Sequence, residues 1–111
     1  MMRIDARLPV RFGPLQARMA DEAVLMDNDT PAANPVGRFT TGPGGHAPGC
    51  RCCTLRSSAS LALATLFRER ATGGGVAFRG VLAVVGPEGE AAVRAALESD
   101  LLVAGRYRLA C

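Results

Sequence analysis

Val81-Leu82-Ala83-Val84-Val85 is the stretch that decides the fold, because every side chain in it is apolar. A strand with one face in water alternates apolar and polar residues, so this run predicts a central strand covered on both faces. Gly86-Pro87 ends the run, and proline suits the first turn of a helix. Apolar residues then recur at helical spacing, which predicts a helix near 88–99.

The residues before this strand also predict a helix and a further strand. Apolar residues at steps of three and four predict a helix near 55–70, and a glycine run ends it. Ala23-Val24-Leu25-Met26 predicts a second buried strand. This order of elements indicates right-handed βαβ units, so we expect a three-layer α/β fold around a small parallel sheet, with strands near 23–26 and 80–85.

The rest of the chain gives weaker patterns. Residues 1–22 are ambiguous: residues 8–12 could form a short strand, but Pro9 argues against one. Residues 30–49 are rich in glycine and proline and predict a loop. Residues 106–110 could open one more strand. We therefore expect an N-terminal segment, 1–22, followed by one α/β domain over residues 23–111.

Length and composition narrow the class of protein. The chain has 111 residues, of which 49% are hydrophobic, as expected for one small globular domain with a modest core. No apolar run approaches the length of a membrane span, and no secretory signal is visible at the N-terminus. These features predict a cytoplasmic protein without a membrane partner, in which cysteines serve metal or redox chemistry more often than disulfides.

Every basic residue of the chain is an arginine: the count of lysine plus arginine is 13, and the sequence contains no lysine. This excludes a phosphate-binding loop that ends in Gly-Lys-Ser/Thr and any lysine Schiff base. The arginines are scattered along the sequence and aromatic residues are few, so we expect no nucleic-acid partner.

The motif Gly49-Cys50-Arg51-Cys52-Cys53 carries the candidate chemistry. Thiolates bind Zn²⁺ and similar cations, and a loop that turns into a helix can aim several of them at one ion. The positive end of the helix dipole and nearby arginines favour ionised sulfur. The alternative interpretation is three small buried residues, but adjacent cysteines on a helix or strand do not both face one core.

Two further groups could join a metal site. His46, the only histidine, lies shortly before the cysteines and is a candidate fourth ligand, although a lone histidine in a glycine-rich loop is more often solvated. Asp27 and Asp29 follow the first predicted strand, but turns favour aspartate for ordinary backbone reasons, so we interpret them as turn residues.

Three stretches resemble the CobW family of GTP-dependent metallochaperones, whose G domain is a P-loop NTPase domain. The first, residues 49–56, matches the family's Gly-Cys-x-Cys-Cys segment and the Thr-x-Arg that follows it. The second is the helix behind the motif, and the third is residues 91–109, which resemble the stretch after the family's second switch. The resemblance covers about residues 45–110 and implies part of a G domain that handles a transition metal.

The departures from the family concern nucleotide handling. Family members carry a lysine in the phosphate-binding loop, an acidic residue after the strand that precedes the second switch, and a segment that recognises guanine. This chain has no lysine, reads Val85-Gly86-Pro87 after the corresponding strand, and ends before any guanine-recognising strand. We therefore expect neither GTP binding nor enzymatic activity.

The sequence thus predicts a truncated, degenerate CobW-like domain that binds a transition metal of the Zn²⁺ class through Cys50, Cys52 and Cys53, with His46 as a candidate fourth ligand. Such a chain would buffer or sense metal, or act as an accessory metallochaperone for a metalloprotein client. Two alternatives stay open: a thiol redox protein that uses Cys50 and Cys52, and a structural domain that pairs with a full-length relative.

Overall fold

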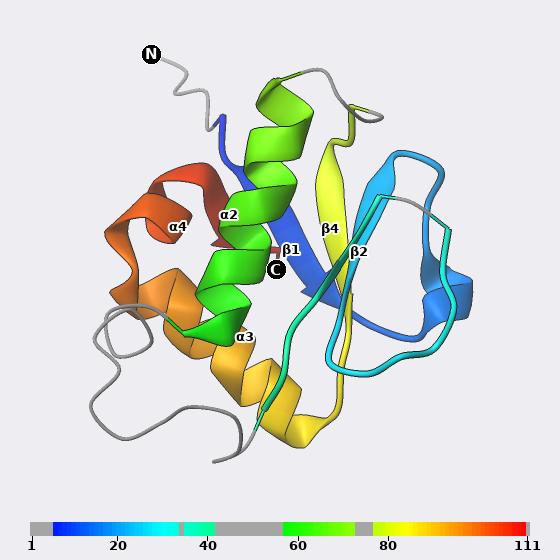
Figure 1. The fold of residues 1–111 in the computed structure, drawn as a ribbon. Helices are drawn as coiled ribbons and strands as arrows, with labels where there is room; N and C mark the ends of the chain where they lie inside the picture. The colour runs from blue at the N-terminus through cyan, green and yellow to red at the C-terminus, as the bar shows by residue number, and fades with distance from the viewer. Residues whose placement is uncertain (1–5, 34, 42–56, 73–76, 111) are drawn as a thin grey trace.

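The computed structural model describes residues 6–33, 35–41, 57–72 and 77–110, and these form an α/β fold around a parallel sheet (Figure 1). The strands are β1 (Leu8–Phe12), β2 (Glu22–Met26), β3 (Val36–Arg38), β4 (Gly80–Val84) and β5 (Tyr107–Leu109). The helices are the 3-10 turn η1 (Leu15–Ala17) and the α-helices α2 (Ser58–Ala71), α3 (Pro87–Ser99) and α4 (Leu101–Arg106).

The sheet confirms the predicted fold class. Its strand order is β3-β2-β4-β1-β5, and all neighbouring pairs run parallel. β4, formed by the continuous apolar run, lies at the centre between β2 and β1. The predicted strands near 23–26 and 80–85 and the predicted helices near 55–70 and 88–99 correspond to β2, β4, α2 and α3.

β1 settles the ambiguity of residues 8–12, which could form a short strand although Pro9 argued against one. β1 lies inside the sheet, flanked by β4 and β5. The pairing with β4 begins only at Val10, opposite Val81, so Pro9 lies one residue before the first pair of residues that β1 and β4 form. A missing N–H group costs little at the start of a strand. The ambiguous segment 1–22 therefore supplies a central strand of the same sheet.

β3 corrects a second expectation, because it lies within residues 30–49, which we predicted to be a loop. Val36-Gly37-Arg38 contains too few apolar residues to be recognised as a strand, but it forms an edge of the sheet beside β2. A Cβ atom at Gly37 would lie 3.0 Å from side-chain atoms of Leu66 in α2. Glycine therefore lets the helix pack closely on the sheet edge.

The helix-covered face of the sheet carries the main core, since α2, α3 and α4 all lie on this side (Figure 1). From the sheet, the cluster includes Val10, Leu25 and Val81, none of which is exposed. From the helices it includes Leu63, Leu66, Val93 and Val103. The hydroxyl of Tyr107 in β5 donates to the carbonyl of Leu63 at 2.7 Å, which ties the edge strand to α2.

The loop-covered face of the sheet has a different cover. Val24, Met26 and Leu82 point away from the helical cluster and are nevertheless buried. On this side the described cover consists of η1 and the connections around β2, with no described α-helix. A Cβ atom at Gly13 would touch both Leu82 and Ala17, which places η1 over the middle of β4. The expected three-layer arrangement is thus asymmetric, with one helical layer and one layer of turns.

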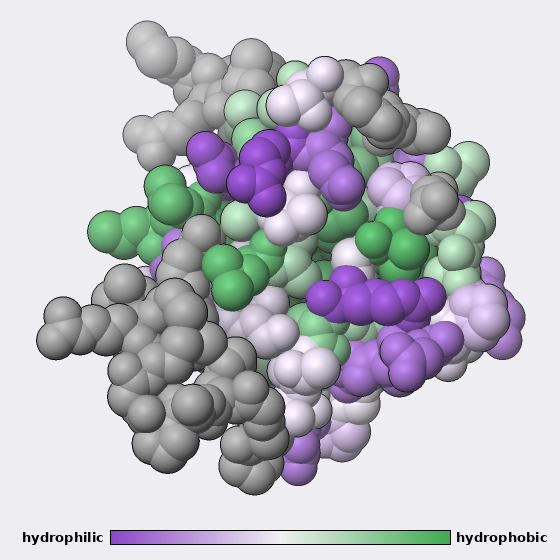
Figure 2. Space-filling view, in the orientation of Figure 1, coloured by the Kyte–Doolittle hydropathy of each residue, from purple (hydrophilic) through white to green (hydrophobic). Residues whose placement is uncertain are grey.

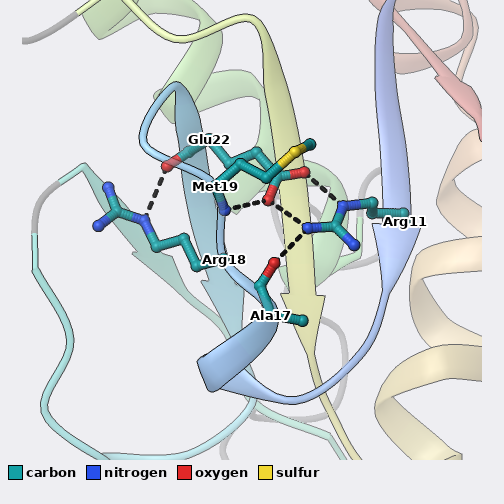
Figure 3. A network of polar contacts seen from close by, with 5 residues as sticks. All are labelled: Arg11, Ala17, Arg18, Met19 and Glu22. Atoms are coloured by element: carbon teal, nitrogen blue, oxygen red, sulfur yellow. Dashed lines mark hydrogen bonds and ion pairs between the residues drawn. The ribbon is translucent and has the colours of Figure 1, made fainter.

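An ion pair between a buried carboxylate and a partly exposed arginine crosses this loop-covered face (Figure 3). Glu22 in β2 is 3% exposed, and its two carboxylate oxygens accept from Arg11 Nε and Nη2 in β1 at 2.6 Å and 2.7 Å. The pair passes over β4, where Gly80 stands level with Glu22 and has no side chain to obstruct it. Met19 N–H donates to the same carboxylate, and Arg11 also donates to the carbonyl of Ala17, so the network fastens η1 to the sheet.

Candidate functional site

Residues 42–56, which contain Cys50, Cys52, Cys53 and His46, lie outside the described residues, as does Cys111. What the structure does place are the two ends of this segment. The backbone N–H of Thr40 donates to the hydroxyl of Ser58 at 3.1 Å, so the residue two positions beyond β3 is bonded to the first residue of α2. Thr40 and Ser58, the described residues that flank this segment, thus lie together at the carboxyl edge of the sheet.

Ser57 fixes the second of these ends. Its backbone is extended, and its hydroxyl accepts from Ser60 N–H at 3.1 Å, which is the standard arrangement of a helix N-cap. Cys53 lies four positions before this cap in the sequence, outside the described residues.

Asp27 has a role that sequence reasoning missed. Its carboxylate, at the end of β2, accepts from the backbone N–H of Gly86 at 2.9 Å, where α3 begins. Gly86 has no side chain to cap that helix, so a carboxylate from a distant strand supplies the acceptor. A Cβ atom at Gly89 would overlap this carboxylate and the side chain of Val85. Glycine in a first helical turn is unusual, so Gly89 was the feature of the sequence that could have indicated a close approach of another group to α3.

The loop after β2 is shaped by hydrogen bonds to its own backbone. Thr30 N–H donates to the side-chain oxygen of Asn28 at 2.9 Å, which is the turn chemistry we predicted for this segment. Arg38, in the neighbouring strand, donates to the carbonyls of Asn28 and Thr30 at 2.6 Å and 2.9 Å. These contacts give Asn28 and Arg38 a structural role. Among the described residues, no group of three or more His, Cys, Asp or Glu side chains could hold a metal ion.

A hollow of about 530 Å³ adjoins the cap of α2. It is lined by small side chains at the start of α2 and along α3, among them the cap Ser57, Ser60 and Ala92. Leu101 and Leu102 form its rim and are 87% and 55% exposed, and Figure 2 shows hydrophobic side chains on the α4 side of this surface. Ser57, the cap of α2, thus lies beside an apolar surface. No described helix has the length and apolar character needed to cross a bilayer.

The comparisons with known proteins add nothing to this geometry. No protein-family model matches the chain, and neither the curated proteins nor the solved structures contain a match. The resemblance to the CobW family therefore stays a prediction that depends on three stretches of sequence.

Proposed function

We propose that this chain binds a transition metal ion of the Zn²⁺ class through Cys50, Cys52 and Cys53, and that it acts as a metal buffer, sensor or accessory metallochaperone without GTP. The observation that carries the proposal is the motif itself, which puts three sulfur ligands within four residues. Thiolates are the ligands that such ions prefer, and a reducing compartment such as the cytoplasm keeps them available. His46, a carboxylate or water completes the coordination.

The ends of the segment support this proposal. Thr40 and Ser58, which flank the segment with the ligands, are bonded to each other, and holding the two ends of a chain segment together lowers the entropy cost of contacts within it. The N-terminus of α2, capped by Ser57, begins directly after the segment. A helix N-terminus so near the ligands in sequence would favour the negative charge that metal binding requires on sulfur.

The carboxyl edge of the sheet supports the absence of nucleotide chemistry. β1 leads through Gly13-Pro14 into η1, a turn of three residues. At the start of α3, the carboxylate of Asp27 already accepts from Gly86 N–H, so a phosphate group there would meet a like charge. Together with the missing lysine, this predicts that calorimetry with GTP and Mg²⁺ will detect no binding at micromolar concentration.

Metal content after anaerobic purification and dialysis tests the proposal. We expect one ion per wild-type chain, loss of the ion in Cys52→Ser, because a hydroxyl is a far poorer ligand than a thiolate, and a smaller loss in His46→Ala. Cys111→Ser is the matched control, since it removes a thiol outside the motif and should retain the ion. Binding should weaken as the pH falls, because protons compete for the same sulfurs.

Equal metal content in the wild type and in Cys52→Ser would refute the site. A metal-free wild type that forms a reversible disulfide bond between Cys50 and Cys52 would instead support the thiol redox alternative. A metal-free and redox-inert protein that pairs with a CobW-type G domain would support the structural alternative.

A further inference from the structure

Arginines stand directly before three neighbouring strands at the amino-terminal edge of the sheet. Arg106 precedes β5, Arg7 precedes β1 and Arg79 precedes β4. Leu8 pairs with Tyr107, so Arg7 and Arg106 are level with each other. Val10 pairs with Val81, so Arg79 is level with Leu8, one residue further along β1 than Arg7. Neighbouring strands lie about 5 Å apart, so the backbones of these residues form a row roughly 10 Å long.

A fourth arginine, Arg70, joins the row from the last turn of α2. Its Nε donates to the carbonyl of Phe78 at 2.6 Å, next to Arg79 in the chain, and its guanidinium lies 5.8 Å from the Phe78 ring. The guanidinium of Arg106 lies 4.7 Å from the ring of Phe67, one helical turn before Arg70. Burial raises the pKa of the Tyr107 hydroxyl, and the charges of both Arg106 and Arg70 oppose that rise, so the two cations flank one side chain.

Three members of the row have no carboxylate partner in the part of the chain that the structure describes: Arg70, Arg79 and Arg106. Arg94 gives the contrast. It stacks on a phenylalanine in the same manner, 5.0 Å from the ring of Phe12, but Glu90 lies 3.0 Å from its Nη2. Stacking fixes the plane of a guanidinium and leaves its N–H edges available for an anion. Glu90 already uses that capacity at Arg94, whereas no carboxylate of the described residues uses it at Arg106.

We infer that this amino-terminal edge, defined by Arg7, Arg70, Arg79 and Arg106, binds the phosphate backbone of a nucleic-acid strand. A row of cations fits a chain of phosphates better than it fits a single anion. A protein partner would be expected to bury an apolar centre. The rings under this row offer none, because Phe78 is 2% exposed and Arg106 stacks on Phe67.

The row also has clear limits. β2 is preceded by Asp21, whose carbonyl accepts from Arg79 N–H at 2.7 Å, so the basic surface ends at that strand. Figure 2 shows hydrophilic side chains gathered over the last turns of α2, which border the row. The arginines are scattered along the sequence, which by itself argues against a nucleic-acid partner. The strand register nevertheless brings these distant positions together at one edge of the sheet.

Fluorescence anisotropy of a short labelled single-stranded DNA, titrated with the full chain at several salt concentrations, tests the inference. Contacts to three or four phosphates predict a log–log salt slope of about −2 to −3, since each contributes roughly 0.7. Arg106→Gln and Arg79→Gln should each weaken binding severalfold and reduce the slope by about 0.7. Arg94→Gln is the matched control, because it removes the same charge from the same kind of stack and should leave both values unchanged.

Arg79→Gln keeps the test decisive if Arg106→Gln disturbs folding, because Arg79 is exposed. Three outcomes would overturn the inference: no binding of the oligonucleotide at low salt, equal losses in Arg94→Gln and Arg79→Gln, or binding of an acidic peptide of matched charge without binding of the DNA. Because none of these measurements depends on the cysteines, a failed metal site would leave the result interpretable.

Discussion

The two faces of this sheet are stabilised by different physics, although the same strands form both. On the helix-covered face, α2, α3 and α4 bury an apolar cluster that includes Leu25, Leu63 and Val81. On the loop-covered face a single 3-10 turn and its connections are fastened by the carboxylate of Glu22 and the guanidinium of Arg11. The first face depends on apolar area, whereas the second adds to the buried Val24, Met26 and Leu82 a few directional bonds around the carboxylate of Glu22.

This difference predicts how each face fails. Apolar burial is nearly independent of pH and scales with the volume removed, so the helix-covered face should respond to the size of a side chain. A buried carboxylate with charged partners responds to protonation and to the removal of either partner. Substitutions on the two faces should therefore differ in size and in their pH dependence.

The largest effect is expected for Leu63→Ala on the helix-covered face. Leu63 is fully buried in the middle of α2, and truncating it leaves a cavity beneath the sheet. We expect the free energy of unfolding to fall by about 3–4 kcal/mol, measured by urea denaturation. Leu61→Ala is the matched control on the same helix: Leu61 is 47% exposed, so its loss should be below about 1 kcal/mol. Similar losses in both variants would contradict the assigned face.

An intermediate effect is expected for Glu22→Gln on the loop-covered face. The amide keeps the shape but loses the charge that accepts from Arg11 and Met19, so we expect a loss of about 2 kcal/mol at neutral pH. Hydrogen bonding from Arg11 is the main cause that lowers the pKa of Glu22 below its ordinary value of 4.5. A lowered pKa stabilises the fold above the unfolded-state value, and that contribution is lost as the pH falls through the folded-state value.

The pH dependence separates this variant from a merely weakened core. Wild type should lose stability below about pH 4.5 through this group, whereas Glu22→Gln lacks it, so their unfolding free energies should converge in acid. Leu63→Ala should keep a constant difference from wild type over the same range. A constant difference for Glu22→Gln as well would show that its charge does not stabilise the loop-covered face.

The sequence predicts the helices and the central strand far better than it predicts β1 and β3. The period of apolar residues located α2 and α3, and the continuous apolar run located β4, because helical burial leaves a repeating pattern. β3 leaves no such pattern, since Gly37 contributes by having no side chain where Leu66 approaches. Pro9 misled the assignment of β1, because the cost of its missing N–H group depends on whether that position is hydrogen-bonded to the neighbouring strand. Only the pairing of the strands decides this.

The same limit applies to the candidate sites. A cysteine motif is local, so its residues can be named from the sequence alone. Asp27 caps α3 from a position 59 residues away, and the arginine row joins residues from both ends of the chain. These arrangements depend on strand order and register, which periodicity alone does not supply.

The smallest effect is expected for Gly80→Ala, which places a methyl group under the ion pair of the loop-covered face. Its Cβ would lie 3.3 Å from the carbonyl oxygen of Pro9 and 3.9 Å from Cγ of Glu22. The tighter neighbour is backbone in a central strand and has little room to move, so we expect a loss of about 1 kcal/mol in urea denaturation. Gly105→Ala is the matched control in α4, where a Cβ meets nothing within 4 Å, and it should stabilise by up to about 1 kcal/mol through helix propensity. If Gly80→Ala stabilised the protein as much as Gly105→Ala, the passage of the ion pair over β4 would not require a glycine.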